Sequence, residues 1–277
     1  MTRAHCWLLA LFLCVPGSAQ AQGVLVAPHA LFIDHQTRSG WIQLHNPGAE
    51  PAEVSLSLLF GYPVTDSLGY LELKLVEQPD STFPSAMGWI QAFPRRMVVP
   101  PQGHQTIRLM VRPPANLADG EYWARVMIAA KGGTAPIQTS DTTTGIQVGL
   151  TLEVRTILPL LYRKGTLQTG VALSQLRAER VGDSLVVRTR MARTGSAVFL
   201  GTVTGALLNQ AGTEVAGFQV PISVYYGIEP RFALSMAGLP PGGYRLRLEV
   251  ASSRDDIAPE LVIPAATVRD SIPIRVR

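Results

Sequence analysis

The sequence predicts an all-β protein made of two β-sandwich domains in tandem. Short runs rich in Val, Leu, Thr and aromatic residues recur along the chain, and no long stretch keeps a helical period. The most regular run, residues 146–162, has an apolar residue at five alternate positions: Ile146, Val148, Leu150, Leu152 and Val154. A period of two is the spacing of a strand with one apolar face. The length of 277 residues suits two domains of roughly 120 to 140 residues better than one.

The first 21 residues predict a secretory signal peptide. Arg3 precedes an apolar run at residues 7–15, and Ala19 and Ala21 form a small-residue cleavage pattern. The run is too short to span a bilayer, and no later segment has 18 uninterrupted apolar residues, so we expect the mature chain to be exported without stable membrane insertion. Both cysteines, Cys6 and Cys14, leave with this segment, which excludes disulfides and thiolate metal sites in the mature chain.

Strand signals then follow one another with turn residues between them. In the first half we expect strands at 31–34, 40–45, 52–60, 96–99, 105–112, 120–130 and 146–162, with a surface loop at 131–145. In the second half we expect strands at 171–180, 184–193, 198–208, 214–222, 231–235, 243–251 and 267–276. Seven strands in each half is the number in an immunoglobulin-like sandwich. The expected domains are residues 22–165 and 166–277, with the boundary between 163 and 169.

A motif that occurs once in each half supports two copies of one architecture. Residues 117–122 and 239–244 share the spacing L-x-x-G-x-Y, and each is followed by an alternating strand. Immunoglobulin-like sandwiches place a tyrosine near the start of the penultimate strand, where its hydroxyl bonds to nearby backbone, so Tyr122 and Tyr244 are expected to form such corners. Coincidence in a chain rich in Gly and Pro is the alternative.

Charge and motifs exclude several classes of function. The formal net charge of +4 is spread over the chain and gives no nucleic-acid-binding stripe. No nucleophile elbow, phosphate loop or dinucleotide fingerprint occurs. His29, His35 and His45 meet only if their strands pair, and none has a metal-ligand spacing. We therefore expect no catalytic residue, no metal and no cofactor; an enzyme that uses these histidines is the weakest of the hypotheses.

Four short stretches carry a family resemblance. They read VAPHALF at 26–32, GWIQLHN at 40–46, FPRRMVVPPQG followed by IRL at 93–109, and LLYR at 160–163. In this order they resemble the periplasmic pilus (fimbrial) chaperones of the PapD-like family, as a divergent member. The second half matches that family only in length and strand style.

The resemblance implies donor-strand complementation. In that family the long G1 strand, here residues 146–162, lends its apolar row to a pilus subunit that lacks its last strand. Pilus or other secreted β subunits would be the partners, together with an outer-membrane usher, and self-association through the same strand is left open. The alternative from the residues alone is that the row is simply a core strand of an exported structural or adhesive module without a client.

The resemblance also implies an anchor for the carboxylate at the subunit's C-terminus. The family uses an Arg on the first strand and a Lys near the end of G1, and local matching puts these positions on His29 and Pro159. Neither residue is a permanent cation. A rebuilt anchor would draw on His29 and on three nearby cations, Arg155, Arg163 and Lys164, because guanidinium groups bind carboxylates bidentately. The alternative is that the three cations are solvated edge charges.

Overall fold

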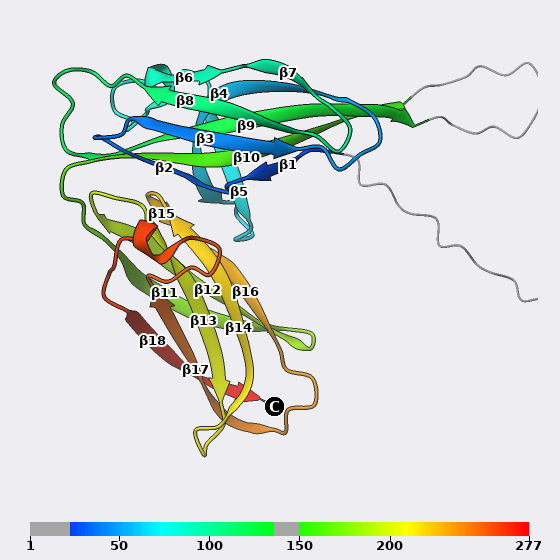
Figure 1. The fold of residues 1–277 in the computed structure, drawn as a ribbon. Helices are drawn as coiled ribbons and strands as arrows, with labels where there is room; N and C mark the ends of the chain where they lie inside the picture. The colour runs from blue at the N-terminus through cyan, green and yellow to red at the C-terminus, as the bar shows by residue number, and fades with distance from the viewer. Residues whose placement is uncertain (1–22, 136–149, 277) are drawn as a thin grey trace, which may run out of the picture.

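The computed structural model describes residues 23–135 and 150–276. The expected signal peptide, and Ile146 and Val148 of the alternating row, lie outside the described residues. Nearly all of the described elements are strands, arranged as two β-sandwiches that meet at an angle (Figure 1). The described part of the chain has no helix long and apolar enough to cross a membrane.

The first sandwich contains two sheets. Its elements are β1 (Leu25–Ala27), β2 (Leu31–Asp34), β3 (Ser39–His45), β4 (Ala52–Thr65), β5 (Leu71–Val76), the 3-10 helix η1 (Met87–Trp89), β6 (Ile90–Phe93), β7 (Arg96–Val99), β8 (His104–Val111), β9 (Gly120–Ala135) and β10 (Leu150–Lys164). One sheet has the order β1-β3-β8-β6 and the other β2-β10-β9-β4-β5, with β7 paired to β4. Apolar residues at alternate positions of both sheets, such as Ile42, Leu44, Ile107, Val126 and Leu160, fill the space between them.

The second sandwich follows the same plan. Its elements are β11 (Thr169–Val181), β12 (Ser184–Gly195), β13 (Phe199–Leu208), β14 (Glu214–Val224), β15 (Gly227–Ile228), β16 (Arg231–Ser235), β17 (Gly242–Ala251), the 3-10 helix η2 (Pro259–Leu261) and β18 (Val268–Val276). One sheet joins β11, β12, β15 and β16, and the other has the order β14-β13-β17-β18. Within residues 23–135 and 150–276, no strand of the first two sheets pairs with one of these. We keep residue 165, between β10 and β11, as the proposed domain boundary.

Both expected tyrosine corners are confirmed. The Tyr122 hydroxyl donates to the Ala118 carbonyl at 3.0 Å, and the Tyr244 hydroxyl donates to the Pro240 carbonyl at 2.8 Å. The two tyrosines bond to the same relative position, four residues upstream. The shared L-x-x-G-x-Y spacing is therefore a shared structure and not a coincidence.

The first sandwich differs from the sequence-based expectation in several places, which include the unexpected strand β6 and the extension of β4 to Thr65. Strand β9 continues to Ala135, five residues into the expected loop, because Lys131 and Gly132 pair with Glu153 and Leu152 of β10. The rest of that loop lies outside the described residues. Strand β5 was not expected at all; its one partner among the described strands is the second half of β4, and the two form a hairpin that leans toward the second sandwich (Figure 1).

Candidate functional site

Strand β10 has one edge that is largely unpaired. Its other edge pairs with β9 along the whole strand, antiparallel. On the open side, β2 pairs with β10 in parallel only at the end of the strand, from Leu160 to Arg163. Among the described residues, no strand covers this side of β10 between Leu150 and Pro159. The backbone groups along that edge are therefore available to another strand.

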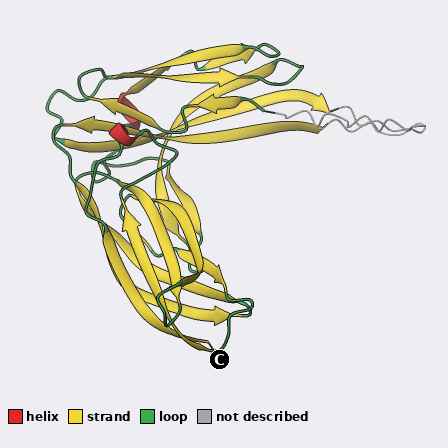
Figure 2. Ribbon diagram, turned by 60° about the horizontal axis from the view of Figure 1, so that its bottom comes forward, coloured by secondary structure: helices red, strands yellow, loops and turns green. Residues whose placement is uncertain are grey.

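The alternating row continues the core-facing row of β10. Leu160 is 0% exposed and Leu158 is 3% exposed, whereas Leu152, on the same face, is 47% exposed. Leu152 lies near the end of the sandwich: it pairs with Gly132, the last residue of β9 that also pairs with β4, and beyond it β9 and β10 continue without β4 (Figures 1 and 2). The row is therefore buried in the protein's own core at Leu160 and exposed to solvent at Leu152. Of the predicted row, Leu150, Leu152 and Val154 belong to the described part of β10.

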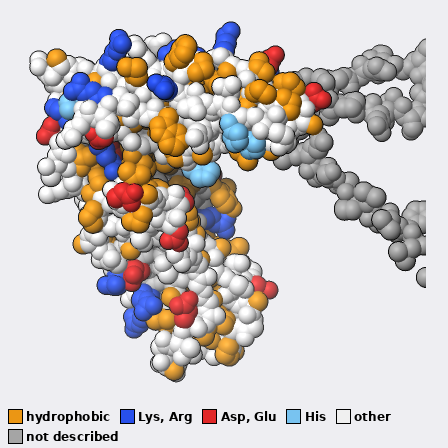
Figure 3. Space-filling view, viewed as in Figure 1, with side chains coloured by type: hydrophobic (Ala, Val, Ile, Leu, Met, Phe, Trp, Pro, Cys, Tyr) orange, Lys and Arg blue, Asp and Glu red, His pale blue; other side chains and the backbone are white. Residues whose placement is uncertain are grey.

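The opposite face of β10 forms part of a cleft between the two sandwiches. The cleft has a volume of about 430 Å³. Strands β2, β10, β9, β4 and β5 provide one wall, and β13, β14 and the segment after β17 provide the other. Its walls are mostly apolar and include Phe32, Leu161, Leu200 and Ile257. Figure 3 shows apolar surface on both sides of the junction between the sandwiches.

The predicted anchor positions separate into two groups. His29 and Pro159 both line the cleft. Arg163 instead pairs with Glu121 and donates to the Leu261 carbonyl at 2.6 Å. The bond to Leu261 joins the two sandwiches, and Arg163 is not among the residues that line the cleft.

The remaining two candidates also have partners of their own. Lys164 pairs with Asp119 at 3.3 Å and also donates to a backbone carbonyl. Arg155 pairs with Glu153 at 2.6 Å, and the Arg155 side chain is exposed. This hydrogen bond holds the pKa of the Glu153 carboxyl below its usual value. An anchoring role for Arg155, Arg163 or Lys164 stays a prediction.

The sequence reasoning missed Arg125, the most deeply buried cation of the cleft. Arg125 on β9 lies directly opposite Pro159 on β10 in the ladder. Residues opposite each other in an antiparallel pair have Cβ atoms about 5 Å apart, so a cation on β9 lies one strand away from the expected lysine position. The only signal in the sequence is a single arginine within the apolar run 122–130.

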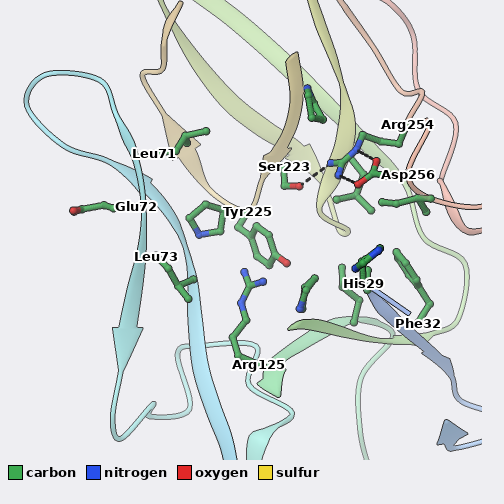
Figure 4. A pocket seen from close by; sticks show the side chains of 17 residues that line it. His29, Phe32, Leu71, Glu72, Leu73, Arg125, Ser223, Tyr225, Arg254 and Asp256 are labelled. Atoms are coloured by element: carbon green, nitrogen blue, oxygen red, sulfur yellow. Dashed lines mark hydrogen bonds and ion pairs between the residues drawn. The ribbon is translucent and has the colours of Figure 1, made fainter. Parts of the chain in front are cut away.

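Arg125 is held by contacts from both sandwiches. Its side chain is nearly buried, with 7% of the residue exposed. Its Nε donates to the Gly61 carbonyl at 3.0 Å, and its guanidinium lies 4.9 Å from the centroid of the Tyr225 ring. Figure 4 shows Arg125 extending into the cleft beneath Tyr225. No ion pair between Arg125 and an acidic residue exists in the part of the chain that the structure describes.

A second arginine of the cleft is neutralised. Arg254 pairs with Asp256 at 2.6 Å and donates to Ser223 Oγ at 3.2 Å (Figure 4). The hydrogen bonds from Arg254 hold the pKa of the Asp256 carboxyl below 3.8. Tyr225 carries no charge at neutral pH, because burial raises the pKa of its hydroxyl above 10. Of the two arginines that line the cleft, Arg125 therefore lacks an acidic partner among the described residues.

Two groups of contacts fix the geometry of the cleft. In the first, the buried carboxylate of Glu121 accepts from Arg163 Nε at 2.8 Å and from the Val198 backbone N–H at 2.9 Å. In the second, the tip of the β4–β5 hairpin rests on the second sandwich, where the Arg231 backbone N–H donates to the Gly69 carbonyl at 2.9 Å and Arg188 donates to the Leu68 carbonyl at 2.7 Å. The two walls of the cleft are therefore joined by hydrogen bonds at two separate points.

The predicted histidines do not form one group. His29 lines the cleft, the His35 ring bonds to the Tyr162 hydroxyl at 2.5 Å, and His45 stacks on His104 with ring centroids 4.2 Å apart. Among the described residues, no three His, Cys, Asp or Glu side chains are grouped so that they could hold a metal ion. The structure therefore offers no support for an enzyme that uses these histidines together.

Comparisons with known proteins identify the fold. No protein-family model and no curated protein matches the chain. A solved chain from the CsuC–CsuE chaperone–tip adhesion subunit complex, from the archaic chaperone-usher Csu pili of Acinetobacter baumannii, is 14% identical. That match covers 89% of this chain and 97% of the other, with a TM-score of 0.50.

Further solved structures match over most of their length. The CupB2 chaperone of Pseudomonas aeruginosa is 12% identical, with 91% of this chain and 100% of CupB2 covered and a TM-score of 0.42. The Salmonella enterica SafA pilin in complex with the SafB chaperone gives a match at 14% identity, with coverages of 92% and 99% and a TM-score of 0.41.

The fold of this protein is thus that of the fimbrial chaperones. The Csu match confirms the predicted class, which is all-β with two immunoglobulin-like sandwiches in tandem. The resemblance to the PapD-like family, noted from short motifs, is confirmed at the level of the fold.

Proposed function

We propose that this protein is a periplasmic chaperone that caps pilus or other secreted β subunits through the open edge of β10. The observation that carries the proposal is the unpaired stretch from Leu150 to Pro159, whose apolar row leaves the protein's own core. A subunit strand added there would form ladder hydrogen bonds with the edge and cover the apolar row. Fimbrial chaperones have the same fold, which supports this function.

The energetics favour binding of a strand and not of a small molecule. Burying apolar side chains contributes roughly 25 cal/mol per Å² before ordering costs, so a row of five could contribute several kcal/mol. Backbone hydrogen bonds along the edge would add affinity that grows with the length of the paired segment. The proposal includes pilus subunits and an outer-membrane usher as partners, a location in the periplasm and no enzymatic activity.

The test uses the row and a matched control. We expect Leu152→Glu with Val154→Glu to leave the protein folded, because Leu152 is half-exposed, but to abolish capture of subunits co-expressed from the same fimbrial gene cluster. The control is Leu25→Glu, an exposed apolar residue on the other sheet, at 61% exposure. Undiminished co-purification of subunits with the β10 variant would refute the proposal and favour the structural or adhesive module, which has no client.

The anchor prediction has its own experiment. If Arg155 and Arg163 hold the subunit's carboxylate, the double variant Arg155→Ala, Arg163→Ala should weaken capture of the same subunits at least tenfold, the range for charge-assisted contacts. Arg155→Ala by itself leaves the bond between Arg163 and Glu121 intact, so weaker capture by this single variant could not come from loss of that bond. Normal capture by the double variant would remove both residues from the anchor.

A further inference from the structure

We propose that strand β5 is a self-complementary edge, through which two copies of this chain join in an antiparallel β5–β5 pair. The proposal does not depend on the proposed function, because it concerns a different strand from β10. Three observations carry it: the open edge of β5, its row of exposed leucines and the order of its charges.

Strand β5 has an open edge. It stands at the end of its sheet, in the order β2-β10-β9-β4-β5, and β4 is its one partner among the described strands. The hairpin touches the second sandwich through its tip, where the Arg231 backbone N–H donates to the Gly69 carbonyl, before β5 begins. The edge of β5 that faces away from β4 can therefore accept another strand.

The ladder with β4 shows which backbone groups lie on that edge. Gly61 is opposite Leu75, and the Gly61 carbonyl accepts from Arg125 on β9, so it points away from β5. Gly61 and Leu75 are thus a pair without mutual hydrogen bonds. Because bonded and non-bonded pairs alternate in an antiparallel ladder, the N–H and C=O groups of Leu71, Leu73 and Leu75 all point toward the open edge.

The apolar side chains of β5 are exposed. Leu71, Leu73 and Leu75 lie on one face of the strand and are 48%, 37% and 48% exposed. Figure 4 shows Glu72 pointing away from Leu71 and Leu73. Glu72 and Lys74 occupy the other face, and neither forms an ion pair with a described residue. The strand therefore offers an apolar row and two charges that lack partners.

Residues 71–75, with the sequence LELKL, match a second copy of themselves in one register. In an antiparallel pair centred on Leu73, Leu71 lies opposite Leu75 of the second copy, and Glu72 lies opposite Lys74 of the second copy. Two-fold symmetry makes each of these pairs occur twice. Every backbone N–H and C=O that the three leucines direct toward the edge then finds a partner.

The charges oppose the neighbouring registers. A pair centred on Glu72 sets two carboxylates opposite each other, and a pair centred on Lys74 does the same with two ammonium groups. Like charges directly opposite destabilise a strand pair. A shift by half a step instead puts a leucine opposite a charged residue. A second copy of this chain is therefore the partner that fits the edge, with Leu73 on the two-fold axis.

Sedimentation velocity over a concentration series tests for the dimer. A paired edge this short buries less area than a standard interface, so we expect the mature protein to dimerise weakly, with a Kd on the order of 10–100 µM. Mature protein that stays monomeric up to about 1 mM would overturn the proposal.

Charge reversal tests the pairing of Glu72 with Lys74. Both side chains are exposed, so the variants should fold. Glu72→Lys and Lys74→Glu should each raise the Kd about tenfold or more, because each creates two like-charge pairs. The double variant Glu72→Lys, Lys74→Glu should restore the homodimer, and an equimolar mixture of the two single variants should form a heterodimer.

The control for charge reversal is Glu179→Lys, an exposed position on β11 of the second sandwich with the same change in net charge. We expect it to dimerise like the wild type. If Glu179→Lys weakens the dimer as much as Glu72→Lys does, or if the mixture of single variants stays monomeric, the proposed pairing is wrong.

A crosslink tests the register. With Leu73→Cys, the two thiols lie on opposite residues with Cβ atoms about 5 Å apart, so a short bis-thiol reagent should link the two copies. With Leu71→Cys, the two thiols lie about 13 Å apart along the strands and should not be linked. The chain without residues 1–21 has no other cysteine. Linking through Leu71→Cys but not through Leu73→Cys would overturn the register.

The variant Leu152→Glu with Val154→Glu separates this edge from β10. We expect it to dimerise like the wild type, because β5 is unchanged. If this variant is monomeric, self-association uses β10 and the β5 proposal fails. If it dimerises but still captures subunits, the proposed function fails and the β5 proposal stands.

Discussion

Replacement of Glu121 by Gln tests how the two sandwiches are held together. The Glu121 carboxylate is completely buried, at 0% exposure, and accepts hydrogen bonds from Arg163, from the Val198 backbone N–H and from the Trp123 indole N–H. Gln keeps an oxygen acceptor but removes the negative charge. Arg163 would then be a largely buried cation whose Nη2 has no hydrogen-bond partner among the described residues.

The expected loss in the free energy of unfolding follows from the burial of Glu121 and Arg163. Removing one partner of a buried ion pair costs about 3–5 kcal/mol, because the other charge stays desolvated. The bond from Arg163 to the Leu261 carbonyl and the contact with the Phe32 ring, 4.6 Å from the guanidinium, offset part of this cost. We therefore expect Glu121→Gln to lower the free energy of unfolding by about 3 kcal/mol.

Urea unfolding followed by tryptophan fluorescence measures this loss. Trp123 is buried at the same junction and stacks edge-on against Tyr225 at 4.7 Å, so it reports directly on separation of the sandwiches. The control is Asp119→Asn, which breaks the exposed pair with Lys164 and should cost at most about 1 kcal/mol. Adding Arg163→Met to Glu121→Gln should recover part of the loss. Equal destabilisation by Glu121→Gln and Asp119→Asn would refute the reasoning.

Two further predictions concern the second sandwich. Tyr244→Phe removes the corner bond to Pro240 and should cost about 1 kcal/mol in thermal or urea unfolding; a change below about 0.3 kcal/mol would mean that the corner adds nothing to stability. The pKa of Asp256 is lowered by Arg254, so the stability from this pair is complete above pH 3.8 and is lost as the pH falls through the lower folded-state value. Asp256→Asn should therefore be less stable than wild type at pH 6 and approach it as the pH drops below 3.8, and a difference that does not depend on pH would contradict this cause.

Several local features could be predicted from the sequence because they depend on neighbouring residues. The alternating row at 146–154 indicated a strand by its period alone, and its described part lies in β10. The repeated L-x-x-G-x-Y spacing predicted both corners, since each bond spans only four residues. Strand β5 was missed although LELKLV alternates, because most of its residues are exposed and its one partner among the described strands is β4.

The candidate site was predictable only in part. Motif matching singled out His29 and Pro159, and the structure places both on the walls of one cleft, His29 in the connection between β1 and β2 and Pro159 on β10. The same matching could not find Arg125, which is 34 positions before Pro159 in the chain and meets it only through the register of β9 against β10. Nor could it show that Arg163 and Lys164 are already engaged by Glu121 and Asp119.

The sequence by itself determined that the chain is all-β, that it contains two similar sandwiches and that one strand carries an unusually regular apolar row. Only the tertiary structure decided that one edge of this strand is left open, and which cation enters the cleft beside it. The physical reason is the separation along the sequence between the residues that contact one another. Strand periodicity and corners arise from contacts within a few residues, whereas strand register and the packing of two sandwiches are the sum of many weak contacts between distant segments.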